Sequence, residues 1–266
     1  MTARVAAITL DFGNTLVPVG RDDLHRVIEL TATEVIERSG PFDRATFLAT
    51  WADERERQFR EEVPQGREVD LDQRVTRVLA RLRGVPAPAA TDHWDDEAAA
   101  TASDDLERAA AVDAYSRAFV STMSVPAGVG SLLERLAAEW TLGVLSNWPH
   151  AATIDAYLEA AGWLGYFRAI VVSQRVGSIK PLPAIFHAAE TVLGIPGNAI
   201  IHVGDDWAAD VVGAKRAGWR AAYLRDSQGD TPLPTSDRDD AVTADLELDR
   251  LADLPAALAH LDSRRG

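Results

Sequence analysis

Short apolar runs alternate with segments of helical periodicity along much of the chain. Five runs have the length of buried strands, and the first contains β-branched residues. They lie at residues 5–10, 142–145, 170–172, 200–203 and 221–224. Between the later runs, apolar residues recur every three or four positions, as in amphipathic helices, at residues 129–139, 154–161, 184–193 and 206–217. Strands that alternate with helices of this length indicate a parallel sheet with right-handed crossovers. We therefore predict an α/β fold with a Rossmann-like parallel-sheet core.

A long segment between the first two runs has a different pattern. From about residue 22 to residue 124 there is no convincing strand, and Ala, Arg, Glu and Leu recur at helical spacing. Helical patterns cover residues 24–35, 44–61, 71–82 and 104–119, whereas the Pro- and Ala-rich residues 84–102 are predicted to form a loop. We predict that residues 18–125 form an all-α cap inserted between the first and second core strands. Residues 1–17 and 126–266 then form the core, which ends in an amphipathic helix over residues 251–261.

Composition and charge narrow the classes of partner. The 266 residues carry a formal net charge of −14 and the pI is near 4.8, so nucleic acid and anionic membranes are not expected as partners. A small anionic substrate would need a local basic site. The absence of cysteine excludes disulfides, thiolate nucleophiles and zinc–thiolate sites. No apolar run is long enough for a secretory signal or a membrane span, so we expect a cytoplasmic protein; the patterns indicate no particular oligomeric state.

Polar residues follow the first two predicted strands. Asp11 comes directly after the first run, and Ser146 and Asn147 follow the second. Functional residues gather at the carboxyl ends of parallel strands. A carboxylate at such a tip can act as a covalent nucleophile or bind a metal, although Asp also begins ordinary turns. A hydroxyl and an amide can bind an oxyanion there, although they also cap helices.

Two further groups follow the third and fourth runs. Lys180 precedes a proline, and it is one of only two lysines in a chain with 27 basic residues. A lysine on such a loop can neutralise a phosphate or steady a carboxylate. Asp205 ends the fourth run and Asp210 lies about one helical turn further on. Carboxylates that crowd together repel one another unless a cation joins them, so a hard metal such as Mg²⁺ is their natural partner.

Together these four motifs resemble those of the haloacid dehalogenase-like (HAD) hydrolases. The resemblance covers roughly residues 3–17 and 126–225, and it includes the segments SIKPLPAIF and GDDWAADVVGAKRAG. It implies three catalytic residues, namely Asp11 as nucleophile and Ser146 and Lys180 as ligands of a phosphate or carboxylate. It also implies a Mg²⁺ ion bound by Asp11, Asp205, Asp210 and the backbone carbonyl of Gly13. The helical cap sits where this family places its C1-type cap.

Residue 13 departs from the pattern of the family's phosphatases, which carry a second Asp there as general acid and base. Gly13 removes that proton shuttle, and Asn14 stands where the family has glycine. Such a shuttle typically contributes ~10²–10⁴-fold to the rate, so three interpretations remain open. The leading one is a Mg²⁺-dependent phosphohydrolase of a small phosphorylated metabolite, in which a cap residue or water moves the proton. The others are a metal-independent dehalogenase-like hydrolase, from a branch that also lacks this Asp, and a binding or regulatory protein without turnover.

Six further residues are candidates for contact with the substrate. They are Asn14, Thr15, Arg21, Asn147, Trp148 and Arg175. Asn14 and Thr15 belong to the first motif, and Trp148 follows Asn147. Trp148 could equally pack beneath the cap, and both arginines could simply be solvated on the surface.

Overall fold

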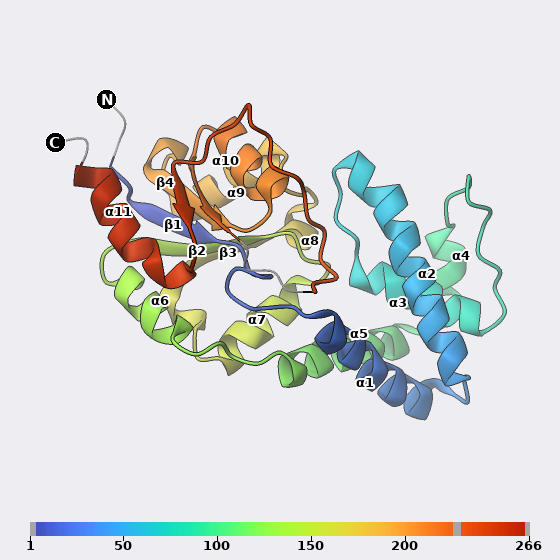
Figure 1. Ribbon diagram of the computed structural model, residues 1–266. Helices are drawn as coiled ribbons and strands as arrows, with labels where there is room; N and C mark the ends of the chain where they lie inside the picture. The colour runs from blue at the N-terminus through green and yellow to red at the C-terminus, as the bar shows by residue number, and fades with distance from the viewer. Residues whose placement is uncertain (1–3, 226–229, 264–266) are drawn as a thin grey trace.

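A parallel sheet with helices on both faces forms the core of the computed structural model, which describes residues 4–225 and 230–263 (Figure 1). The described strands are β1 (Ala7–Leu10), β2 (Thr141–Ser146), β3 (Phe167–Val172), β4 (Ile200–Gly204), β5 (Arg220–Leu224) and β6 (Leu246–Leu248). Their order in the sheet is β3-β2-β1-β4-β5-β6, and all pairs are parallel. The predicted α/β class is confirmed. The prediction missed β6, because a strand of three residues, Leu-Glu-Leu, carries too little pattern to recognise.

The strand order reverses at β1, which lies between β2 and β4. Leu10, the last residue of β1, pairs with Val144 on one side and Val203 on the other. All four residues of β1 are buried, as expected for a central parallel strand. Residues that follow β1, β2 and β4 therefore emerge at one edge of the sheet. In open α/β sheets this switch point is where ligands bind.

Helices cover the two faces of the sheet and form two apolar cores. On one face, α9 (Pro183–Leu193) packs with the segment from Trp207 to Arg216. On the other, α6 (Val129–Ala137), α7 (Ala151–Ala160) and α11 (Leu254–Ser263) contribute to a core shared with the helical insertion. Shorter helical turns are α8 (Ser173–Val176), η2 (Leu164–Tyr166), η3 (Gly197–Ala199) and η5 (Leu251–Asp253).

The helix after β4 differs from its predicted form. Residues 206–217 were predicted as one helix, but the first part, η4 (Trp207–Val212), is a π-helix, and α10 (Gly213–Arg216) continues it. Asp206 caps the start by accepting a hydrogen bond from the Ala209 backbone N–H at 2.7 Å. Single π-helical turns are frequent at functional sites, and this one carries Asp210.

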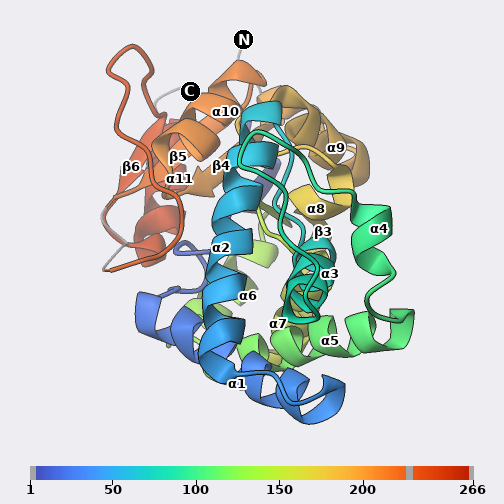
Figure 2. The same cartoon turned by 90° about the vertical axis from the view of Figure 1, so that its right-hand side faces the viewer.

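The regular elements described between Arg21 and Thr122 are all helices, and we call this segment the helical insertion. Its helices are α1 (Arg21–Ser39), α2 (Arg44–Glu62), η1 (Val63–Gln65), α3 (Leu71–Leu82), α4 (Asp96–Ala100) and α5 (Asp105–Thr122). They lie beside the sheet, at the edge where β1 ends (Figures 1 and 2). The predicted loop 84–102 contains the short helix α4, whose cap Asp95 accepts from the Ala98 N–H at 2.9 Å. No described helix is long and apolar enough to cross a membrane. Residues 1–3, 226–229 and 264–266, which the sequence assigned to the core, lie outside the described residues.

Candidate active site

A tight turn follows β1 and carries the first motif. The Asp11 backbone N–H donates to Val203 O at 2.9 Å, which ties the tip of β1 to β4. Leu16 N and Val17 N both donate to Phe12 O, and this closes the turn. Asn14 lies in the left-handed region, with φ 56°, a conformation that Asn tolerates better than most residues. This explains how Asn replaces the glycine of the family pattern at this position.

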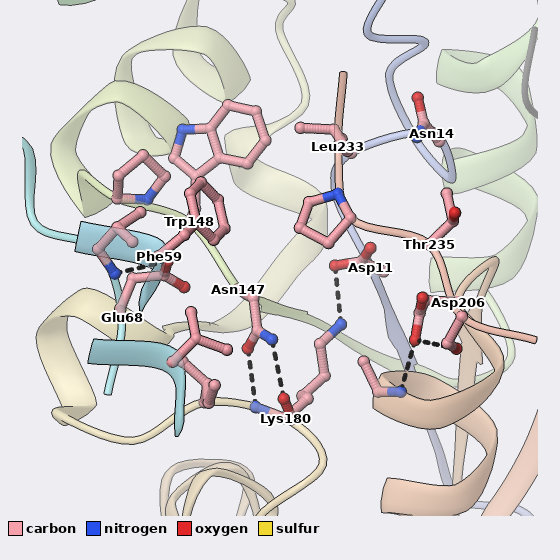
Figure 3. Close-up of a pocket in the computed structure, with 18 of the residues that line it drawn as sticks. Asp11, Asn14, Phe59, Glu68, Asn147, Trp148, Lys180, Asp206, Leu233 and Thr235 are labelled. Atoms are coloured by element: carbon pink, nitrogen blue, oxygen red, sulfur yellow. Dashed lines mark hydrogen bonds and ion pairs between the residues drawn. The ribbon is translucent and has the colours of Figure 1, made fainter. Parts of the chain in front are cut away.

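A buried lysine joins the predicted nucleophile to one of the predicted metal ligands. Lys180 Nζ donates to Asp11 Oδ1 at 2.9 Å (Figure 3). It also donates to Asp210 Oδ1 at 2.6 Å and to Leu145 O at 3.0 Å. Its three protons therefore all have acceptors. Asp205 completes the cluster, since the carboxylates of Asp11, Asp205 and Asp210 each have an oxygen within 4.8 Å of the others.

Three neighbouring residues fix the position of Asp210, namely Gly204, His202 and Asp206. A Cβ at Gly204 would lie 2.1 Å from Asp210 Oδ2, so only glycine allows this close approach. His202 is fully buried, and its ring bridges Thr9 Oγ1 at 2.9 Å and Asp210 Oδ1 at 3.0 Å. The Asp206 N–H donates to Asp210 Oδ2 at 2.9 Å. Asp210 is thus held on both oxygens.

The cluster carries more negative than positive charge. Burial raises the pKa of Asp205 to about 8, and the charges of Asp11 and Asp210 add to the rise. Burial also raises the pKa of Asp11, although Lys180 opposes the shift. At Asp210 burial acts in the same direction, but Lys180 and His202 outweigh it and lower the pKa. Lys180 shows the converse: burial lowers its pKa, and the two carboxylates more than reverse the effect. When Asp11, Asp205 and Asp210 are all ionised, the single ammonium of Lys180 does not match their charge, and a divalent cation bound by the three carboxylates would offset the excess and favour ionisation of Asp205.

Asn147 holds Lys180 in place. Its Oδ1 accepts from Lys180 N at 2.8 Å, and its Nδ2 donates to Lys180 O at 3.0 Å. Both ends of the amide are engaged with the backbone, so Asn147 fits a positioning role better than the predicted contact with substrate. Trp148 both lines the cavity and packs against other aromatic rings. Its ring lies edge-on to Phe12 and Phe119, with centroid distances of 5.4 and 5.3 Å.

The space beside Gly13 is filled by other side chains. A Cβ built there would lie 2.7 Å from Leu233 Cδ1 and 3.3 Å from Trp148 Cζ3. Leu233 belongs to the connection between β5 and β6, which crosses the site and is held by Asn14 Nδ2 donating to Thr231 Oγ1 at 3.1 Å. Figure 3 shows Leu233 beside the turn that carries Asp11 and Asn14. A side chain at position 13 would therefore require Leu233 to move.

A cavity of about 440 Å³ lies between the helical insertion and the carboxylate cluster. Eight of the predicted site residues line it: Asp11, Gly13, Asn14, Asn147, Trp148, Lys180, Asp205 and Asp210. The insertion adds four polar residues that the sequence did not single out, Arg55, Glu68, Arg74 and Tyr115. A signal for Arg74 was present, because it follows Leu71 by three positions and precedes Val78 by four, inside the buried stripe of α3.

Loop contacts tie this part of the insertion to the core. Ser173 Oγ donates to Glu68 Oε2 at 2.5 Å, and Gln174 Nε2 donates to Asp70 Oδ2 at 3.1 Å. Two backbone bonds join the same segments: Ile179 N–H to Gly66 O at 3.1 Å and Leu71 N–H to Pro149 O at 3.0 Å. Burial raises the pKa of Glu68, against the effect of the hydrogen bond from Ser173.

Comparison with known proteins shows which family this sequence matches. Residues 5–218 match the family of haloacid dehalogenase-like hydrolases. The chain belongs to this family. Among curated HAD relatives, the Escherichia coli 5-amino-6-(5-phospho-D-ribitylamino)uracil phosphatase YigB is 31% identical over 138 residues, which cover 52% of this chain and 54% of YigB. The human N-acylneuraminate-9-phosphatase is 26% identical over 177 residues, 65% of this chain and 69% of that protein. The chain thus spans about half the length of YigB.

Solved HAD structures share the fold. The 2-haloacid dehalogenase from Pseudomonas syringae pv. Tomato DC3000 superposes with a TM-score of 0.67 at 22% identity, covering 96% of this chain and 99% of that one. At this identity the likeness concerns the fold alone.

Four predicted site residues do not line the cavity between the helical insertion and the carboxylate cluster. Arg21 and Arg175 lie on the surface in ion pairs with Asp230 at 2.8 Å and Asp155 at 2.6 Å, so their positions give the predicted contact with substrate no support. Thr15 Oγ1 donates to Asp205 Oδ1 at 3.0 Å and so orients a predicted metal ligand. Ser146, the last residue of β2, is buried at 1% exposure.

Proposed function

We propose that the protein is a Mg²⁺-dependent phosphohydrolase that acts on a small phosphorylated metabolite, with Asp11 as its nucleophile. The observation that carries this proposal is the convergence of Asp11, Asp205 and Asp210 beneath a single buried lysine. The phosphatase names of the curated relatives support the same reaction class.

The donor set fits a magnesium ion. Hard divalent cations take carboxylate and carbonyl oxygens, and oxygens of three carboxylates lie within 4.8 Å of one another here. Asp11, Asp205 and Asp210 would hold the ion, with the Gly13 carbonyl as a further ligand. When bound, it would neutralise charge on the phosphoryl oxygens and orient them for attack.

The chain's own residues supply the remaining steps. Lys180 holds Asp11 Oδ1, and no described donor holds the other carboxylate oxygen. That oxygen attacks phosphorus, a bond from carboxylate to phosphorus forms, and the bond from phosphorus to the ester oxygen breaks. Water then hydrolyses the phosphoaspartate, which releases phosphate and restores Asp11. Positioning and charge neutralisation provide most of the catalysis in such transfers.

The leaving group's proton needs a source other than residue 13. Glu68 fits this task among the residues of the insertion: it lines the cavity, and the pKa of its carboxyl is raised by burial. A carboxyl with a raised pKa is a better proton donor near neutral pH than an exposed one. Figure 3 shows Glu68 and Asp206 on opposite sides of Asp11. Asp206 also lines the cavity with a pKa raised by burial, and both carboxyls accept hydrogen bonds. We assign the acid role to Glu68 because it belongs to the helical insertion, where the sequence placed the alternative source of the proton.

The test is a screen of phosphate esters with Mg²⁺ and with a chelator, for the wild type and for Asp11→Asn. We expect phosphate release that requires both the metal and Asp11. Release that survives Asp11→Asn would exclude the covalent mechanism. Halide release from 2-haloacids in the presence of chelator would instead identify the dehalogenase-like alternative, and binding without turnover in every arm would identify the non-catalytic one.

A further inference from the structure

Three polar side chains of the helical insertion line the otherwise apolar part of the cavity. Arg55 comes from α2, Arg74 from α3 and Tyr115 from α5. The wall around them is made largely of apolar side chains, among them Leu24, Ile28, Trp51, Phe59 and Leu182. Polar groups placed in such a wall usually set the orientation of a ligand.

Arg74 is a buried cation without a partner carboxylate. It is 3% exposed, its Nε donates to Gln58 Oε1 at 2.9 Å, and its guanidinium lies 5.7 Å from the centre of the Trp51 ring. No described carboxylate lies within 4.0 Å of it. Burial lowers the pKa of Arg74 to about 10. A buried charge is costly unless a counter-charge joins it.

The other two buried arginines of the insertion differ from Arg74, because both form ion pairs with carboxylates. Arg57 pairs with Glu61 at 3.2 Å, and Arg77 pairs with Glu61 at 3.3 Å and with Asp96 at 2.7 Å. Neither of them lines the cavity. The buried arginine that faces the cavity is the one that lacks a counter-charge, which indicates that its partner is a ligand.

Arg74 is held in a fixed orientation. Gln58, which accepts from it, donates through Nε2 to Asp70 O at 2.8 Å and to Gln73 Oε1 at 2.9 Å. The guanidinium is therefore positioned before any ligand arrives. Such pre-organisation lowers the entropy lost on binding.

Arg55 and Tyr115 complete a group of hydrogen-bond donors. Arg55 donates to Pro232 O at 3.0 Å and stacks over Phe59 at 4.7 Å, again with no described carboxylate within 4.0 Å. Tyr115 is 3% exposed, and its hydroxyl has no hydrogen-bond partner among the described residues. Burial raises the pKa of Tyr115, and the charges of Arg74 and Arg55 both oppose the rise, so all three groups are electrostatic neighbours.

Two acidic groups of the insertion also face this region. Glu68 and Asp70 both act on the pKa of Arg74, but each is held elsewhere. Glu68 accepts from Ser173 Oγ and Val69 N, and Asp70 accepts from Gln73 N and Gln174 Nε2. Neither approaches Arg74 closely enough to form an ion pair.

We propose that Arg74, Arg55 and Tyr115 form a second anion site, which binds a carboxylate or phosphate group of the substrate away from its scissile phosphoryl group. The proposal rests on the proposed function for the placement of that phosphoryl group at Asp11. Two guanidinium forks and a phenol match the oxygens of an oxyanion. The substrate class is then a phosphomonoester with a compact apolar or ring-shaped body and a second oxyanion.

A matched series of aryl phosphates tests the site by kinetics. Phenyl phosphate lacks the second anion, 3- and 4-carboxyphenyl phosphate add a carboxylate at two positions, and 1,4-phenylene bisphosphate adds a phosphate. For the wild type we expect kcat/KM to be at least about tenfold higher, which is about 1.4 kcal/mol, for one or more of the doubly anionic esters. The preference should lie mainly in KM, because the second anion is bound equally before and during the reaction.

Arg74→Met should abolish that preference and leave phenyl phosphate nearly unchanged. Arg74→Lys should restore part of it, since the charge returns without the fork. The control is Arg60→Met, which removes the same charge from an exposed position on α2 and should keep the preference. Equal losses for phenyl phosphate and its carboxylated forms in Arg74→Met would overturn the proposal.

Ligand binding to the Asp11→Asn variant distinguishes a failure of the proposed anion site from a failure of the proposed phosphohydrolase function. Calorimetry with the same four esters and Mg²⁺ should show tighter binding of a doubly anionic ester, and Arg74→Met in the same background should remove the difference. Such binding without any hydrolysis by the wild type would uphold the anion site and refute the phosphohydrolase. Hydrolysis without a preference, or no binding of any doubly anionic ester, would refute the anion site.

Discussion

Removing one carboxylate from the cluster should stabilise the metal-free protein while it abolishes the effect of magnesium. The perturbation is Asp205→Asn, which keeps the shape of the side chain and an oxygen that can accept from Thr15 Oγ1. Asp205 is 8% exposed, and burial with the charges of Asp11 and Asp210 raises its pKa from 3.8 to about 8.

The raised pKa of Asp205 sets the sign and the size of the change in the free energy of unfolding. The folded-state pKa of Asp205 lies above its unfolded-state value, so the unfolded chain releases this proton first. The free energy of unfolding should therefore fall as the pH rises from about 4 to about 8 and then level off. At about 1.36 kcal/mol per pKa unit, the shift of Asp205 from 3.8 to about 8 lowers the free energy of unfolding by roughly 5 kcal/mol by pH 8. Relaxation of the cluster reduces this figure, so we expect Asp205→Asn to gain at least about 1 kcal/mol near pH 8 without metal.

Urea denaturation at about pH 5 and about pH 8, with chelator and with Mg²⁺, measures these differences. The wild type should gain stability from Mg²⁺, because a ligand bound only by the folded state stabilises it, whereas Asp205→Asn should gain little. The exposed Asp113→Asn on α5 is the control for loss of a charge. The reasoning is refuted if Asp205→Asn is no more stable than the wild type in chelator near pH 8, or if Mg²⁺ stabilises both equally.

Three further predictions concern neighbouring residues. Lys180→Met leaves Asp11 and Asp210 without their buried cation, so the free energy of unfolding in chelator should drop by about 3–5 kcal/mol; wild-type stability in urea would contradict this. Gly13→Asp alone should be poorly tolerated because of Leu233, whereas Gly13→Asp with Leu233→Ala should turn over phosphate esters about tenfold faster or more than Leu233→Ala alone. An equal kcat for these two proteins would show that proton transfer does not limit the rate. Glu68→Gln should slow hydrolysis of alkyl phosphates by about tenfold or more and spare p-nitrophenyl phosphate, whose leaving group needs no proton; equal losses would point to a structural role.

The sheet and its motif positions could be predicted because they depend on local patterns. Alternating apolar runs and helical periodicity are properties of consecutive residues, and a parallel sheet places every strand's carboxyl end at one edge. This rule and the resemblance to the HAD motifs together led us to expect Asp11, Lys180, Asp205 and Asp210 at one site, and all four line one cavity. The π-helical start of η4 and the short strand β6 were missed, because neither has a distinct periodicity.

Which side chains actually meet in the cavity was decided by tertiary packing. Leu233 is 220 positions from Gly13, yet its Cδ1 occupies the space that a second aspartate would need. Arg55, Arg74 and Tyr115 come from three helices, and each taken alone resembles an ordinary helix residue. Whether a buried arginine pairs with a carboxylate, as Arg77 does, or faces a cavity depends on the angles at which the helices pack. The sequence by itself determined the place of Asp11, the proposed nucleophile, at the tip of β1. The tertiary structure decided what surrounds it, because those contacts join residues far apart along the chain.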